Sequence, residues 1–269
     1  MIIEAEQTDL DKILNIVSDD IFQNVYLYID ILVCGITNDH VKTWIISDNN
    51  KINFILYKYY NSLQVFCVEK KANANILEVI KNIKENNYEM ISGRSDFVAN
   101  LISNGLSDYS MFEGGIFSRE NVNINDGTLQ RRCELASKDE MDEIAALICS
   151  DNDIGGHYSV ELLSKQLVNR MENEGCRNLV YKVNGKIVAH FATYAETSKI
   201  GVLGGLITLP EWRGKGIGRL LINELSSILY SNGKKPVLYC YSLKLMQWYA
   251  SMGWKEITHC AKLERNRGL

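Results

Sequence analysis

The sequence predicts an α/β protein of two domains that share one order of elements, and three observations support this. The chain has 269 residues, the length of one large domain or two ordinary ones. Its apolar residues form short strand-like runs alternating with helix-like stripes. The polar, turn-forming stretch 121–127 interrupts this pattern near the midpoint. We therefore expect domains at 1–125 and 126–269.

The first half contains two helical segments, three consecutive strand-like runs, and then an alternation of helices and strands. The helix at 73–87, for example, places four apolar side chains on one face. The expected order is helix 9–18, helix 21–34, strands 41–47, 51–59 and 63–68, helix 73–87, strand 88–92, helix 97–103 and strand 109–117.

The second half repeats this order. Asn184–Gly185 is a strong two-residue hairpin signal between two strands, and Asn232–Gly233 caps the end of the longest helix. The expected elements are strand 131–136, a helix beginning at 139, helix 160–174, strands 179–183, 186–194 and 200–208, a helix ending near 231, strand 237–241, helix 243–252 and strand 254–262.

Composition argues against several classes of protein. Thirty-three acidic and 29 basic residues give a net charge of −4, which argues against binding to nucleic acid or anionic membranes. The amino terminus has acids where a signal peptide would have Lys or Arg, and no apolar run approaches the ~18 residues of a membrane span. Seven widely spaced cysteines include no CxxC motif. We expect a cytoplasmic protein with free thiols and no metal site.

The most informative segment is a loop that follows the buried strand at 200–208 and opens the next helix. Three glycines alternate there with three basic residues, from Arg213 to Arg219. Glycines allow close approach of the backbone, and the unpaired N–H groups of a helix start attract anions. The pattern favours a phosphate or pyrophosphate site over a merely flexible turn.

Two common phosphate-binding motifs do not fit this loop. A Walker loop requires Ser or Thr after its lysine, but Gly216 follows Lys215. A dinucleotide fingerprint requires a third glycine where Arg219 stands and an acid about 20 residues later, and the stretch 234–241 contains no acid.

The remaining match is to an acyl-CoA loop. The run Arg213-Gly-Lys-Gly-Ile-Gly218 fits the signature [Q/R]-x-x-G-x-[G/A], and Tyr249 stands four residues before a Gly-aromatic pair, Gly253–Trp254. In both features, residues ~131–262 resemble the GCN5-related N-acetyltransferases (GNAT). The resemblance implies a mixed, mostly antiparallel central sheet flanked by helices in each domain.

The first half lacks the corresponding chemistry. Where the second half has its glycine-rich loop, the first has Glu69-Lys-Lys-Ala-Asn-Ala74, and Leu101 stands at the tyrosine position. It therefore resembles the degenerate domain of tandem GNAT proteins. Its expected role is structural, or to form one wall of the acceptor cleft.

The resemblance also implies a site for acetyl-CoA in a gap beside the strand at 200–208. Tyr249 would protonate the departing thiolate, since a phenol of pKa ~10 can supply that proton. Ser242 replaces the Asn that often bonds pantetheine. The implied cofactor-binding residues are Leu206, Ile207 and Thr208 through their main chain, Arg213, Gly214, Lys215, Gly216, Ile217, Gly218 and Arg219 in the loop, and Ser242.

A general base is missing from its usual place. Some members carry a Glu on the strand before the loop, where this chain has Val202. Candidates by chemistry alone are Glu196, His190, His157 and Glu161, and each is also explained as a solvated or core residue. The amine would otherwise lose its proton to water or before binding.

The resemblance implies an acetyl-CoA-dependent N-acetyltransferase acting on a primary amine of a small molecule or peptide by direct attack in a ternary complex. The alternative is a non-catalytic acyl-CoA-binding sensor or regulatory module. Five acids between 151 and 174 would suit a cationic acceptor, and a solvated face explains them equally well. We expect a monomer or homodimer, since a tandem repeat supplies internally what single-domain relatives obtain by dimerising.

Overall fold

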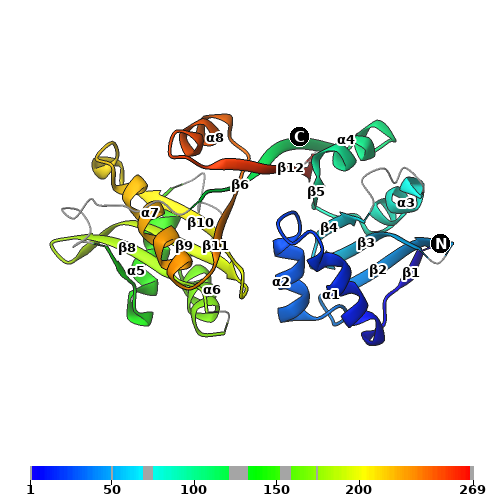
Figure 1. The fold of residues 1–269 in the computed structure, drawn as a ribbon, viewed down its shortest axis with the longest axis horizontal. Helices are drawn as coiled ribbons and strands as arrows, with labels where there is room; N and C mark the ends of the chain where they lie inside the picture. Colours follow the sequence, from blue (N-terminus) through cyan, green and yellow to red (C-terminus); the bar gives the residue numbers. More distant parts are fainter. Residues whose placement is uncertain are drawn as a thin grey trace. The chain divides into compact units, whose positions relative to one another are not determined.

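A computed structural model describes residues 2–49, 51–68, 75–120, 133–151, 159–173 and 175–266. The first half contains, in order, β1 (Ile2–Glu4), α1 (Leu10–Ser18), α2 (Val25–Cys34), β2 (Val41–Asp48), β3 (Lys51–Tyr59), β4 (Ser62–Cys67), α3 (Ile76–Asn86), β5 (Met90–Arg94), α4 (Ser95–Ser103) and β6 (Tyr109–Ser118). Figure 1 shows the elements in sequence colours.

The second half contains β7 (Cys133–Leu135), α5 (Met141–Cys149), α6 (Val160–Asn173), β8 (Asn178–Val183), β9 (Lys186–Glu196), β10 (Ile200–Thr208), α7 (Ile217–Ser231), β11 (Lys235–Cys240), α8 (Leu243–Ala250) and β12 (Lys255–Arg265). The predicted order of elements holds throughout. The sequence analysis missed only β1 among the strands, because three residues are too few for an alternating pattern.

The chain divides into two compact units. The first comprises Met1–Phe117, Cys240–Trp248 and Glu256–Leu269, and the second comprises Ser118–Tyr239 and Tyr249–Lys255. The boundary expected at 125/126 lies outside the described residues. The division also differs from a single cut there, because two carboxy-terminal segments belong to the first unit.

Both units contain a mixed, mostly antiparallel sheet, as predicted. The strand order is β1-β2-β3-β4-β5-β12-β6 in the first unit and β7-β8-β9-β10-β11 in the second. Each has one parallel pair at the same place in the order, β4 with β5 and β10 with β11, while the neighbouring pairs are antiparallel. The two halves therefore share topology as well as element order.

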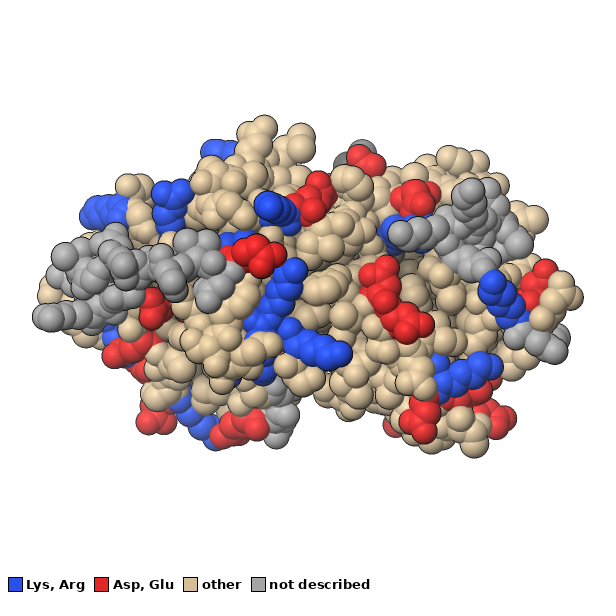
Figure 2. All heavy atoms as spheres, viewed as in Figure 1, with Lys and Arg blue, Asp and Glu red and all other residues tan. Residues whose placement is uncertain are grey.

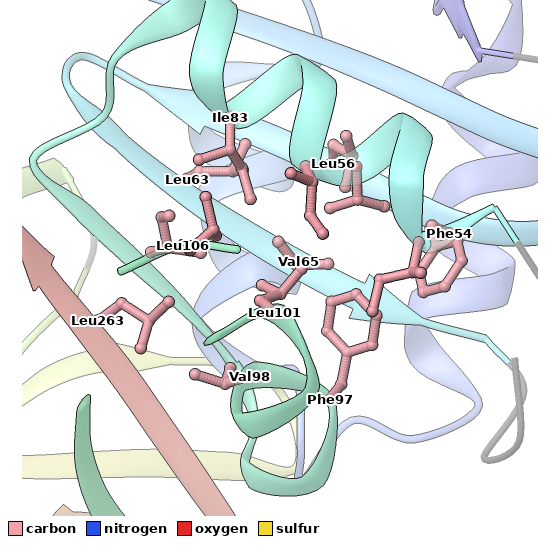
Figure 3. Close-up of a cluster of buried hydrophobic side chains, with 14 of the residues drawn as sticks. Phe54, Leu56, Leu63, Val65, Ile83, Phe97, Val98, Leu101, Leu106 and Leu263 are labelled. Carbon is pink, nitrogen blue, oxygen red and sulfur yellow. The ribbon is translucent and has the colours of Figure 1, made fainter. Parts of the chain in front are cut away.

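Helices cover both faces of the first unit's sheet. Alternate residues of β3 explain this: Phe54 and Leu56 pack with α3 and α4, whereas Ile55 and Tyr57 pack with α1 and α2. Leu263 of β12 is fully buried in the α3–α4 cluster (Figure 3). The last strand of the chain is thus part of this core.

In the second unit, α5 and α6 cover one face and α7 packs on the other. Val180, Ile187 and Ile207 of the sheet share a core with α5 and α6. Gly201 of β10 faces α7, since a Cβ there would lie 2.5 Å from Leu229 Cδ2.

On the described part of the face in Figure 2, Lys and Arg side chains are interspersed with Asp and Glu. No helix among the described residues is long and apolar enough to span a membrane.

Candidate active site

The parallel pair β10–β11 opens partway along β10. Its register runs from Ile200↔Lys235 to Leu203↔Leu238 and ends there, whereas β10 stays paired with β9 as far as Thr208↔Ala189. Beyond Leu203, β10 therefore has a registered partner on one edge only. Leu206, Ile207 and Thr208 lie in this stretch, where main-chain groups at the other edge are available to a ligand.

A β-bulge lies in the same stretch. Gly204 pairs with Ala192 and Ile207 with His190, so Gly205 and Leu206 together oppose one residue of β9. Gly205 has φ +67°, in the left-handed region that favours glycine. Tyr194 packs against the neighbouring Gly204, where a Cβ would lie 2.6 Å from Tyr194 Cε2. The backbone conformation at 205 and the packing of Tyr194 at 204 therefore require glycine at these two positions.

His190 contacts this bulge from β9. It is fully buried, with Nδ1 3.2 Å from the Gly205 carbonyl oxygen and Nε2 3.0 Å from Asn178 Oδ1. Burial lowers the pKa of His190 to about 4. His190 was a candidate general base, and the structure corrects this: both ring nitrogens are engaged and no solvent reaches them.

Two of the other candidate bases are engaged in ion pairs. The Glu196 carboxylate is 2% exposed and pairs with both Arg177 and Lys234, so it is an ion-pair centre. Glu161 lies on the exposed surface of α6 and pairs with Lys165 at 2.8 Å. His157 lies outside the described residues. Val202 is fully buried.

The glycine-rich loop leads directly into α7. Gly214 and Gly216 have φ of +75° and +78°, and a Cβ at either would meet nothing within 4 Å. Backbone conformation, not packing, therefore selects glycine here, and the space beside the loop is open. Gly216 is the N-cap of α7 and no side chain caps the helix there, so first-turn N–H groups remain for an anion. Ile217 and Gly218 begin this turn.

The three basic side chains around the loop have distinct partners. Arg213 donates from Nε to the Thr208 carbonyl at 2.9 Å and pairs with Asp151 at 3.0 Å. Lys215 Nζ lies 4.2 Å from the Trp212 ring centroid, and Arg219 donates to the Ser251 carbonyl at 3.4 Å. Arg213 thus joins the loop to the end of β10, a role that the sequence pattern did not reveal.

Tyr249 lies in the last turn of α8 and is 8% exposed. Its ring meets that of Trp254 edge-on, with centroids 5.9 Å apart. Both residues belong to the second unit, as does the loop. Arg219 bonds to Ser251, two residues after Tyr249, so the start of α7 is tied to the segment that follows Tyr249.

Ser242 belongs to the first unit. Its Oγ accepts the Leu245 N–H at 3.5 Å and its carbonyl accepts the Met246 N–H at 2.8 Å. The structure therefore gives Ser242 a capping role at the start of α8.

Sequence reasoning also missed a buried cation in the second unit. Arg119 is 4% exposed, donates from Nη1 to Asn223 of α7 at 2.8 Å, and lies over the Trp254 ring at 5.5 Å. Burial lowers its pKa. No sequence signal marks this arginine, because its partners lie more than 100 residues away.

The first unit contains a cavity of about 920 Å³. Four acids line it: Asp20, Asp96, Glu113 and Glu256. Three of them already bond to neighbours, Asp96 to Arg94, Glu113 to Ser95 and Glu256 to His259.

Leu101, at the position equivalent to Tyr249, is fully buried in the core. Residues 69–74 lie outside the described residues. Within the described part of the chain, no cluster of His, Cys, Asp or Glu could hold a metal ion.

Comparisons with known proteins agree with this fold. The family model for the acetyltransferase (GNAT) domain matches residues 149–266. No curated protein matches the chain. Among solved structures, a GCN5-related N-acetyltransferase from Sphaerobacter thermophilus aligns with 100% of this chain and 96% of its own, at 13% identity and a TM-score of 0.68.

Two further structures are similar over nearly their whole length. A GNAT-family acetyltransferase from Colwellia psychrerythraea has a TM-score of 0.65 at 13% identity, with 99% of this chain and 100% of that chain covered. A tandem GNAT protein from the clavulanic acid biosynthesis pathway has a TM-score of 0.56 at 9% identity, with 100% and 99% covered. At these identities the likeness shows the fold alone.

Proposed function

We propose that the chain is an acetyl-CoA-dependent N-acetyltransferase, on the premise that residues 149–266 match the family model for the acetyltransferase (GNAT) domain. One observation carries the proposal: β10 parts from β11 immediately before an open glycine loop at the uncapped start of a 15-residue helix. A strand with an unpaired edge suits an extended amide arm, and the helix start suits a pyrophosphate. Acetyl-CoA contains both groups in that order.

The loop and the strand would bind different parts of acetyl-CoA. The N–H groups of residues 214–218 and the charge of Arg219 would hold the pyrophosphate. Main-chain groups of Leu206, Ile207 and Thr208 would bond the pantetheine arm and the acyl carbonyl. The Thr208 carbonyl already accepts from Arg213, which leaves its N–H for this purpose.

The proposed reaction is direct attack of a primary amine, from a small molecule or peptide, on the thioester carbon. A C–N bond forms, the C–S bond breaks, and Tyr249 donates its proton to the leaving sulfur. The attacking nitrogen loses one proton as the amide forms, and that proton restores the Tyr249 phenol through water. N–H groups at the open edge of β10 would stabilise the negative charge on the carbonyl oxygen. With Val202 at the usual base position, and Glu196 and His190 engaged elsewhere, we propose that the ammonium proton leaves to water.

Calorimetric titration with acetyl-CoA tests the binding step. An Arg213→Ala/Gly216→Asp double variant places a negative charge at the start of α7 and should abolish micromolar binding. Gly233→Asp is the matched control, since Gly233 also has positive φ and open space but lies at the other end of α7. No binding by the wild-type protein would overturn the proposal.

Turnover is tested separately by release of free thiol from acetyl-CoA across a panel of primary amines. Thiol release that depends on one amine supports the enzyme. Tight binding of acetyl-CoA with no release across the panel would instead support the sensor alternative, in which the domain holds the acyl-CoA without transferring the acetyl group.

A further inference from the structure

We infer that His190 is a positioning residue that orients the N–H of Leu206 toward the acyl carbonyl. This inference rests on the proposed function. It starts from the bulge, where the Gly205 carbonyl oxygen lies 3.2 Å from His190 Nδ1 instead of taking part in a regular ladder. The peptide that carries this carbonyl also carries the N–H of Leu206.

The proposed role requires one tautomer of His190, in which Nδ1 donates to the Gly205 carbonyl. A carbonyl oxygen can only accept, so Nδ1 must carry the proton that it donates to Gly205. A neutral imidazole then has a lone pair on Nε2, which needs a donor. The atom 3.0 Å from Nε2 is Asn178 Oδ1, which can only accept, so this arrangement requires the Asn178 amide to be turned so that its NH₂ faces Nε2. With a pKa of about 4, His190 stays neutral and keeps this single arrangement near neutral pH.

The peptide plane carries this orientation to Leu206. The Gly205–Leu206 peptide is trans, so its C=O and N–H point in opposite directions. His190 pairs with Ile207 across the sheet, and Ile207 packs against α5 and α6, so the imidazole lies on that face. The Leu206 N–H is therefore directed away from it, toward the face where α7 begins with its open loop.

The contact with His190 reaches the Gly205 carbonyl where the strand has lost one of its neighbours. β11 is no longer in register, and glycine at 205 has the widest choice of backbone conformation. The neighbouring Tyr194 leaves no room for a side chain at 204 or 205. Burying a histidine here carries a desolvation free energy that an apolar residue would avoid. What the histidine contributes, and an apolar residue could not, is the hydrogen bond to Gly205.

Two substitutions separate the two ring nitrogens. The amide nitrogen of Asn at 190 takes nearly the place of Nδ1 and can still donate to Gly205, whereas that of Gln takes nearly the place of Nε2 and cannot. The probes are coenzyme A, acetyl-CoA and acetyl-CoA labelled with ¹³C at its carbonyl. Thr193→Val is the control, because Thr193 is equally buried on β9 but bonds to Glu196 and Arg177.

In the wild-type protein, binding should shift the labelled carbonyl band to lower wavenumber. His190→Gln should lose this shift and bind acetyl-CoA about fivefold to tenfold more weakly, with coenzyme A affinity within about twofold. His190→Asn should retain the shift and most of the affinity. Thr193→Val should lower the unfolding temperature without moving the band.

An unchanged carbonyl band in His190→Gln would overturn the inference and leave the proposed function intact. Equal losses in the Asn and Gln variants, in proportion to their unfolding temperatures, would also overturn it, as a purely structural role predicts. Imidazole ¹⁵N shifts showing the proton on Nε2 would do the same. Failure of the wild-type protein to bind either form of coenzyme A would overturn both proposals.

Discussion

Arg213 donates from Nε to the carbonyl oxygen of Thr208 at 2.9 Å, which links the first residue of the glycine-rich loop to the last residue of β10. The same guanidinium pairs with Asp151, just after α5. The basic residue at the head of the loop is thus engaged in holding the loop against the strand. Loop and open strand edge are therefore fixed relative to each other before any ligand arrives.

We expect Arg213→Gln to weaken acetyl-CoA binding about tenfold, because the loop loses its anchor to β10. Asp151→Asn is the control: the Arg213 side chain is 55% exposed, so loss of this pair alone should change affinity less than about threefold. Calorimetry on both variants checks this. Equal losses in the two would show that the Asp151 pair, and not the Thr208 bond, holds the loop.

Tyr249→Phe should lower kcat about a hundredfold with little change in coenzyme A affinity, since only the proton donor is removed. The ring would still pack against Trp254. Tyr230→Phe is a suitable control, because Tyr230 lies near the far end of α7 and donates to the Arg119 carbonyl. Steady-state kinetics with an active amine provide the measurement, and an unchanged kcat would remove the acid role of Tyr249.

The free energy of unfolding should fall as pH decreases from about 6.5 to about 4. In that range the unfolded chain binds a proton at His190 and the folded chain does not, because burial lowers the folded pKa from 6.5 to about 4. The contribution of this one residue amounts to about 3 kcal/mol. Urea titrations at several pH values should show a flatter profile for His190→Asn, and an identical slope in both proteins would contradict the expectation.

Leu263→Ala should destabilise the first unit by about 3 kcal/mol, because Leu263 of β12 is fully buried among residues of α3, α4 and β4. Leu245→Ala, at a 45% exposed position of α8, should change stability by less than about 0.5 kcal/mol. Chemical denaturation monitored by circular dichroism measures both. Similar effects of the two would show that β12 contributes little to this core.

The placement of β12 also changes what truncation can test. A fragment lacking residues 1–125 loses β5, to which β12 pairs from Cys260↔Arg94 to Glu264↔Met90. We expect that fragment to expose an unpaired strand and to aggregate. Size-exclusion chromatography of the fragment provides the measurement, and a soluble monomer with the kinetics of the full chain would contradict this and the idea that the first half forms a wall of the acceptor cleft.

The sequence by itself determined the features that depend on neighbouring residues. Asn184 and Gly185 both adopt positive φ in the hairpin they predicted, and the glycines at 214 and 216 do so in the loop. The apolar stripe of α7 and the order of strands and helices in both halves follow from local periodicity in the same way.

Only the tertiary structure decided the features that depend on residues far apart in the chain. The bond between His190 and Gly205, the two ion pairs of Glu196 and the place of β12 beside β5 each join different elements. His190 and Glu196 were possible bases because the sequence gives the chemical type of each side chain. The sequence does not give their burial or their partners, since these arise only when strands pair and helices pack over them.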